Sequence, residues 1–120
     1  MKKDKKMYYH IRINGGGPWE IVQVIGEAVA FDGWPSIRLF VAEIVGRYQV
    51  HDVKSGKRVF VTDRKAHIRK GLDKLALIYS DNGMLAISEQ CCKEYGPLPE
   101  PTKTRNPELR LWPLDFQSKY

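Results

Sequence analysis

Branched and aromatic residues alternate with polar ones through the first half of the chain, a period-two pattern typical of β-strands that bury one face. The alternation predicts a strand over residues 7–13 and another over residues 36–45. Residues 19–31 predict either one long strand or two short strands kinked at Gly26, because a glycine inside a strand often marks a bulge. The first half of the chain is therefore predicted to be mainly sheet.

The next apolar runs predict a β-hairpin. Residues 48–53 and 59–61 are rich in branched and aromatic side chains, and they flank a short polar turn at residues 54–57 that holds one glycine. A turn of this length and composition suits a tight antiparallel connection.

Beyond the hairpin, apolar residues recur every three or four positions, which predicts a helix over residues 63–80. Thr62 or Asp63 is placed to cap its first turn. Leu77 falls on the polar side of this helix, so we expect it to contact another element or a partner. Gly71 lowers helix propensity and is expected to permit close packing against a neighbour. The apolar stripe consists of Ile68, Leu72, Leu75, Ala76 and Tyr79.

A second helix is predicted over residues 84–95, where apolar residues again follow helical spacing. Gly96, followed by a proline, is typical of a helix end. Asn82-Gly83 would then be the turn between the two helices. The same dipeptide is also the strongest short hairpin signal, so two strands over residues 75–80 and 84–88 remain the alternative.

These elements together predict an α+β fold. We expect an antiparallel sheet of four to five strands in residues 7–62, with one face covered by the two-helix pair. After residue 96 the chain becomes proline-rich and polar, which predicts an extended arm over residues 97–120. The apolar residues 109–116 are expected to dock this arm back onto the sheet, and the alternative is that they bind another copy or a partner. Residues 1–6 are expected to form a mobile basic stub ahead of a single domain that ends at residue 96.

The positive charge of the chain is unevenly distributed. The 120 residues carry a formal net charge of +6 at pH 7. Residues 54–74, the predicted hairpin turn and first helix, hold eight Lys and Arg against two Asp, so this segment alone carries a charge as large as that of the whole chain. A concentrated positive surface attracts polyanions without sequence preference. The basic residues concerned are Lys54, Lys57, Arg58, Arg64, Lys65, Arg69, Lys70 and Lys74.

No motif in the sequence predicts catalysis, a cofactor or a metal. The glycines at residues 15–17 precede a predicted strand instead of a helix, so they make no dinucleotide-binding fingerprint; we expect a plain hairpin loop there, and a phosphate-contacting loop is the alternative. Cys91 and Cys92 are adjacent, which makes their side chains diverge where two zinc ligands need to converge. His51 and Asp52 are adjacent in a predicted strand and point to opposite faces. We therefore predict no catalytic residue, no cofactor and no metal site, and a protein that is not an enzyme.

The chain contains no apolar run of the about 18–20 residues that a bilayer span needs. Its first residues lack the apolar segment of a signal peptide. Two adjacent cysteines do not make a disulfide framework, which agrees with a reducing compartment. We expect a cytoplasmic protein with no membrane partner.

Two functional hypotheses follow. The first is a small non-enzymatic binding module whose basic residues contact DNA or RNA. The alternative is a protein-interaction module, an accessory or inhibitor subunit of the kind found in phages and mobile elements. It would bind an acidic protein, or a second copy of itself through the C-terminal arm. Trp19 and Trp34 are expected to pack in the core or against turns. The predicted partner-binding residues are Leu77, Leu111, Trp112 and Phe116.

Overall fold

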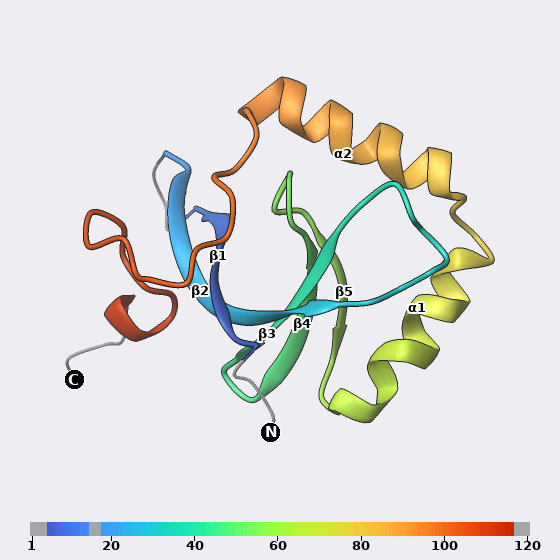
Figure 1. Ribbon diagram of the computed structural model, residues 1–120, viewed down its shortest axis with the longest axis horizontal. Coiled ribbons are helices and arrows are strands. Elements are labelled where there is room, and N and C mark those ends of the chain that lie inside the picture. Colours follow the sequence, from blue (N-terminus) through green and yellow to red (C-terminus); the bar gives the residue numbers. More distant parts are fainter. Residues whose placement is uncertain (1–4, 15–17, 117–120) are drawn as a thin grey trace.

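The sheet predicted from the alternating pattern is present in the computed structural model, which describes residues 5–14 and 18–116 (Figure 1). Five antiparallel strands follow one another in sequence order, each hydrogen-bonded to the next. Most of the predicted basic stub (residues 1–4) and the predicted glycine loop (residues 15–17) lie outside the described residues. The strands are β1 (Met7–Ile13), β2 (Glu20–Val29), β3 (Leu39–Ile44), β4 (Arg47–Asp52) and β5 (Arg58–Thr62).

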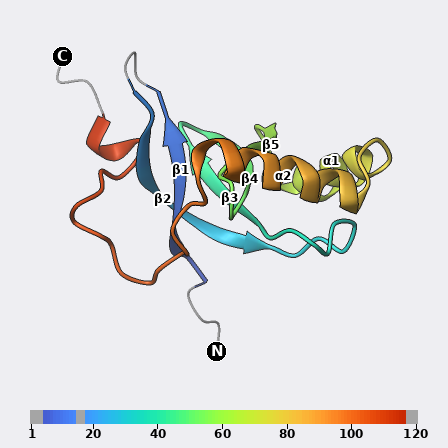
Figure 2. The ribbon, with the colours of Figure 1, turned by 90° about the horizontal axis from the view of Figure 1, so that it is seen from above.

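Two helices complete the predicted α+β fold. Helices α1 (Ile68–Ala76) and α2 (Asp81–Tyr95) lie beside the half of the sheet formed by β3, β4 and β5 (Figures 1 and 2). A short 3-10 helix, η1 (Lys65–His67), leads into α1, and another, η2 (Leu114–Phe116), lies in the C-terminal arm. The arm runs along the other half of the sheet, beside β1 and β2 (Figure 2).

Strand β2 changes partners along its length. Residues 20–26 pair with β1, and residues 27–29 pair with β3. Gly26 lies at this change, where a Cβ atom would come within 2.6 Å of the Val41 carbonyl oxygen. The predicted segment is thus one continuous strand, and glycine is needed in it because the β3 backbone approaches so closely.

The sheet is buried on both faces, and β3 shows this most clearly. Phe40 is fully buried in one apolar cluster, where its ring stacks on Tyr9 with 4.2 Å between the ring centroids. Val41 belongs to a second cluster between the sheet and the helices, together with Leu72 of α1 and Met84 of α2. Burial on both faces fixes the register of β3, because a slip of one residue would exchange the two sets of side chains.

The first helix starts later than predicted. It was expected over residues 63–80 with a cap from Thr62 or Asp63, but α1 begins at Ile68 and no side chain caps either η1 or α1. Thr62 Oγ1 instead accepts a hydrogen bond from the Arg64 amide at 3.3 Å. This local turn satisfies the backbone without a helix, and so it delays the helix start.

The connection between the helices also differs from the prediction. Asn82-Gly83 was expected to be the turn between the helices or the turn of a hairpin, and both interpretations are wrong. Ser80 caps α2 through its Oγ, which accepts a hydrogen bond from the Gly83 amide at 3.0 Å, so Asn82 and Gly83 form the first turn of the helix. The predicted end is confirmed, since α2 stops at Tyr95 and Gly96 has a positive φ of 85°.

Gly71 brings α1 into close contact with β5, as expected. A Cβ atom at this position would lie 2.0 Å from Phe60 Cζ. We predict that Gly71→Ala lowers the free energy of unfolding by about 1–3 kcal/mol, because overpacking outweighs the roughly 1 kcal/mol that alanine adds to helix propensity. Urea denaturation measures this change, and the loss should shrink in a Phe60→Leu background. A gain in stability from Gly71→Ala alone would contradict the tight packing.

Candidate functional site: a cationic cavity between the hairpin, α2 and the arm

The eight basic residues predicted to bind nucleic acid fall into two groups at opposite ends of β5. This strand has five residues and spans about 13 Å, which is the distance that separates the two groups along the sheet. The hairpin group, at the β4–β5 turn, consists of Lys54, Lys57 and Arg58. The helix group, around η1 and α1, consists of Arg64, Lys65, Arg69, Lys70 and Lys74.

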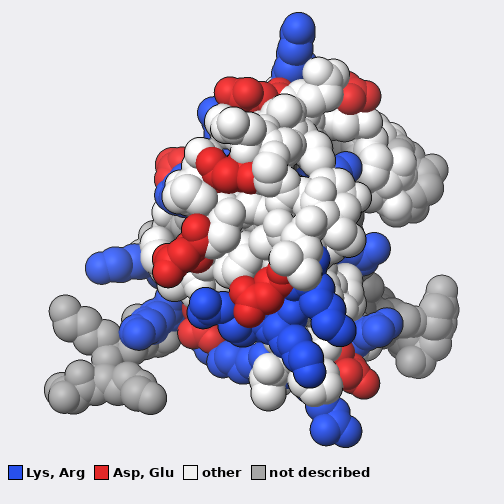
Figure 3. Space-filling model, turned by 90° about the vertical axis from the view of Figure 1, so that its right-hand side faces the viewer, with Lys and Arg blue, Asp and Glu red and all other residues white. Residues whose placement is uncertain are grey.

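The helix group is partly neutralised by carboxylates. Lys65 Nζ lies 2.8 Å from Glu27 Oε1, and Arg69 Nε lies 3.3 Å from Asp73 Oδ1. Such exposed pairs contribute little to stability, but they reduce the net charge of the surface. Figure 3 shows the side of the molecule that lies at the right in Figure 1. Lys and Arg gather over the lower part of this view, with Asp and Glu among them.

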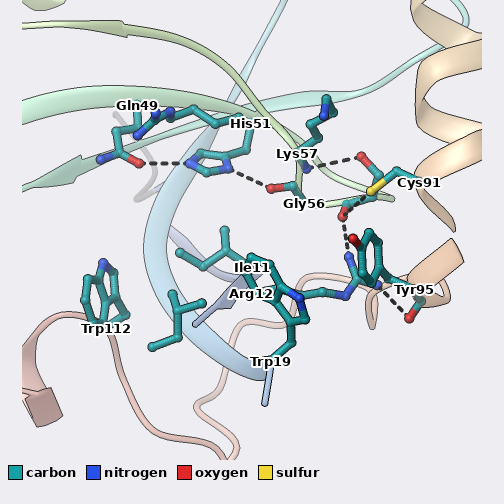
Figure 4. A pocket seen from close by; sticks show the side chains of 13 residues that line it. Ile11, Arg12, Trp19, Gln49, His51, Gly56, Lys57, Cys91, Tyr95 and Trp112 are labelled. Carbon is teal, nitrogen blue, oxygen red and sulfur yellow. Dashed lines mark hydrogen bonds between the residues drawn. The ribbon is translucent and has the colours of Figure 1, made fainter. Parts of the chain in front are cut away.

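The hairpin group borders a cavity of about 570 Å³ that the sequence analysis missed. Its walls come from β1, the β4–β5 hairpin, α2 and the arm (Figure 4). The volume lies within the about 300–1,000 Å³ typical of sites for small ligands. Arg12, Lys57 and Arg58 line it, and no Asp or Glu of the described residues does. The cavity is therefore electropositive.

Arg12 joins β1 to both the hairpin and α2. Its guanidinium donates hydrogen bonds to the Ser55 carbonyl oxygen at 2.6 Å, to the Tyr95 carbonyl oxygen at 3.3 Å and to the Gly96 carbonyl oxygen. A cation at a helix C-terminus is stabilised by the helix dipole and satisfies carbonyls that lack a helical partner. None of these three partners is a carboxylate, so the guanidinium keeps its formal positive charge at the cavity.

A buried carboxylate fixes the hairpin turn against α2. Asp52 is 3% exposed, and its Oδ2 accepts hydrogen bonds from the Ser55 amide (3.1 Å), the Ser55 hydroxyl (2.5 Å) and the Ser88 hydroxyl (2.5 Å). Three donors on one oxygen compensate for much of its lost hydration. The turn that carries Lys57 is thereby held beside the helix that carries Tyr95.

His51 forms part of the cavity wall, and the hydrogen bonds of its ring go to Gly56 and Gln49 instead of the Asp52 carboxylate. Its Nδ1–H donates to the Gly56 carbonyl oxygen at 2.8 Å, and its Nε2 lies 3.1 Å from the Gln49 side-chain oxygen. The ring is 5% exposed and stacks on Phe40. Burial lowers the pKa of His51 from 6.5 to about 4, so the ring is neutral at pH 7.

Three aromatic side chains from distant parts of the chain line the same cavity. Trp19 is 55% exposed and Tyr95 is 49% exposed, and their ring centroids lie 6.0 Å apart. Trp112 of the arm is half-buried and lies across the cavity from Tyr95 (Figure 4). Trp34 is buried in the core as expected, but Trp19, which immediately precedes β2, is not.

The arm is held in place around Gln23 of β2. The Gln23 amide donates to the Arg110 carbonyl oxygen at 2.9 Å, and the Gln23 carbonyl oxygen accepts from the Trp112 amide at 2.7 Å. The Gln23 side-chain oxygen accepts from the Asn106 amide at 2.9 Å. Arg110 also forms a two-point ion pair with Glu20, at 2.9 and 2.6 Å. These contacts place Trp112 at the cavity.

The residues predicted to bind a partner protein differ in exposure: one is on the surface and three are buried or partly buried. Leu77 is 88% exposed, so it does not make the contact with another element that its position suggested. Leu111 is 7% exposed, and Trp112 and Phe116 are partly buried against the apolar cluster of β1, β2 and β3. These three side chains therefore face the core of this chain.

The cysteines show no arrangement for chemistry. Cys91 lines the cavity, with its Sγ 3.8 Å from the Ser55 carbonyl oxygen. Burial raises the pKa of Cys92, which disfavours the reactive thiolate. Within residues 5–14 and 18–116, no group of three or more His, Cys, Asp or Glu side chains is placed to hold a metal ion.

Comparison with known proteins assigns no function to this site. No protein-family model matches the sequence, no curated protein is significantly similar to it, and no solved structure matches its fold. None of the helices in the described part of the chain is long and apolar enough to cross a bilayer. A function for the cavity therefore has to be inferred from its geometry.

We predict that the protein loses stability as the pH falls, in part through His51. Because the pKa of His51 is about 4 in the folded state and 6.5 when unperturbed, the unfolded state binds its proton first. This contribution is complete above about pH 6.5 and is lost progressively down to about pH 4, for a total of about 3 kcal/mol.

Urea denaturation at neutral pH and at about pH 4.5 measures this loss. His51→Gln should shrink the difference in free energy of unfolding between the two conditions. His67→Gln, at an exposed position, is the matched control and should leave the difference unchanged. An undiminished difference in His51→Gln would show that the buried imidazole does not titrate in this way.

Proposed function

We propose that this protein is a non-enzymatic module that binds nucleic acid, and that phosphates contact the hairpin group beside the cavity. The observation that carries the proposal is the lining of the cavity, which includes the exposed cations Lys57 and Arg58 and no described carboxylate. Cations that are left without carboxylate partners attract phosphate groups, and the attraction does not depend on base sequence.

The origin of the charge supports this proposal. Arg12 adds a guanidinium held at a fixed place, and its hydrogen-bond partners are all neutral. His51 is neutral at pH 7, so Lys and Arg alone supply the charge of the cavity. The attraction should therefore persist across the neutral pH range.

The separation of the two basic groups favours a long anion over a small one. The hairpin group and the helix group are separated by the length of β5, about 13 Å. A single phosphate or small anion reaches one group only, whereas a nucleic acid strand can contact both. The helix group would then extend the contact, chiefly through Arg64, Lys70 and Lys74, which have no carboxylate partner in the described residues.

We predict that Lys57→Gln with Arg58→Gln weakens binding of short labelled oligonucleotides and flattens its salt dependence. Each phosphate contact on a single strand adds about 0.7 to the slope of log affinity against log salt, so loss of two contacts should reduce the slope by roughly 1.4. Fluorescence anisotropy titrations over a range of salt concentrations measure both quantities.

Two charge-matched variants accompany this measurement. Lys93→Gln with Lys103→Gln removes two exposed cations that do not line the cavity, and should leave the slope unchanged. Arg64→Gln with Lys70→Gln tests the helix group, and a loss confined to that variant would place the contact there instead of at the hairpin group. Absence of binding by the intact protein at low salt would rule out a nucleic-acid module.

A protein-interaction module is the second candidate, and exposed apolar side chains at the α1–α2 connection favour it. Leu77 is 88% exposed and Ile78 is 72% exposed. Adjacent apolar side chains of this size in water often mark an interaction surface. The partner would then contact this connection, and the arm would stay docked on the sheet.

For this candidate, we predict self-association of the intact protein that rises with concentration and is lost in Leu77→Ser with Ile78→Ser. Because both side chains are exposed, the free energy of unfolding should change by no more than about 0.5 kcal/mol. Sedimentation velocity at several concentrations measures the association. A protein that remains monomeric throughout would exclude pairing of two copies through this surface.

A further inference from the structure

Attraction to phosphate does not account for the aromatic side chains of the cavity. Trp19 and Tyr95 are each about half exposed, and they line the same space as Lys57 and Arg58. Large exposed rings have an energetic cost in water, and here they lie beside cations. The combination of aromatic rings and neighbouring cations is the one that single-strand-binding proteins use to stack bases and hold the backbone.

The rings are placed around a space of suitable size. Trp112 lies on one side of the cavity, and Trp19 and Tyr95 lie on the other (Figure 4). Apolar side chains of β1, Ile11 and Ile13, line the space between them. The volume of about 570 Å³ leaves room for a flat ring against these surfaces.

The opposite wall carries hydrogen-bonding groups. Gln49 and His51 lie above the apolar side chains in Figure 4. The Gly56 carbonyl oxygen accepts a hydrogen bond from the His51 Nδ1–H, and this bond fixes the imidazole ring in place. The Gln49 side-chain oxygen already contacts His51 Nε2 at 3.1 Å, which leaves the nitrogen of this partly buried amide to donate a hydrogen bond to the edge of a flat ligand.

We infer that the cavity takes one unpaired base of a single-stranded nucleic acid, stacked on its aromatic walls, while Lys57 and Arg58 hold the flanking phosphates. The inference rests on the proposed function, because it specifies which form of nucleic acid the site accepts. A base within a duplex is already paired and stacked, so its entry would cost the energy of extruding it. Single strands are therefore preferred over duplexes.

The test compares three probes on the intact protein at low salt: a short oligothymidylate, an abasic strand with the same number of phosphates, and the duplex of the first. We expect the oligothymidylate to bind at least about fivefold more tightly than the abasic strand. Trp19→Ala should weaken binding of the oligothymidylate by a similar factor and leave binding of the abasic strand unchanged. Tyr79→Ala removes an exposed ring outside this cavity, and should preserve the full difference.

The outcomes separate the two levels of the proposal. Equal affinity for the oligothymidylate and the abasic strand overturns base insertion and leaves phosphate binding intact. Failure of both strands to bind overturns the proposed function itself. A difference that persists in both Trp19→Ala and Trp112→Leu overturns the inference, because the base then binds elsewhere. Circular dichroism melting shows that each variant is folded, which is expected for Trp19→Ala because its side chain is more than half exposed.

Discussion

One buried carboxylate oxygen holds together two walls of the cavity, the hairpin turn and α2. Asp52 Oδ2 gathers two donors from Ser55 in the hairpin turn and one from Ser88 in α2. The other oxygen, Oδ1, is also buried and has no hydrogen-bond partner among the described residues. Separating the turn from the helix would remove the Ser88 donor from a buried carboxylate whose Oδ1 already has no described partner, and this is costly in a protein interior. The turn and α2 therefore dock together, and the cations of the turn are held in a fixed position.

The remaining walls are attached in the same way, by polar contacts at the edges of an apolar core. Arg12 connects β1 to the turn and to the end of α2, and Gln23 connects β2 to the arm. The two apolar clusters, one on each face of β3, supply most of the burial that stabilises the fold. The polar contacts contribute less burial but determine where Tyr95 and Trp112 lie relative to the hairpin. The geometry of the site thus depends on these polar contacts in addition to the apolar core.

The fold was largely predictable from the sequence, and the site was not. Period-two alternation predicted the strands, because successive side chains of a strand point to opposite faces of the sheet. Helix ends were predicted less well, since one serine, Ser80, outweighed the turn preference of Asn82-Gly83. Counting charges along the sequence identified the basic segment. It did not show that the segment is divided into a hairpin group and a helix group, because that depends on the direction and length of β5. The cavity joins Arg12 to Trp112, and no spacing along the chain indicates that they meet.

The position of the arm in the chain has a consequence for synthesis. A polypeptide leaves the ribosome N-terminal end first, so β2 and the rest of the sheet are made well before residues 106–112 are available to cover Gln23. During that interval the backbone groups at the uncovered edge of β2 can pair with a strand of another nascent chain. The arm that completes the cavity therefore also covers this part of the β2 edge once residues 106–112 have been made.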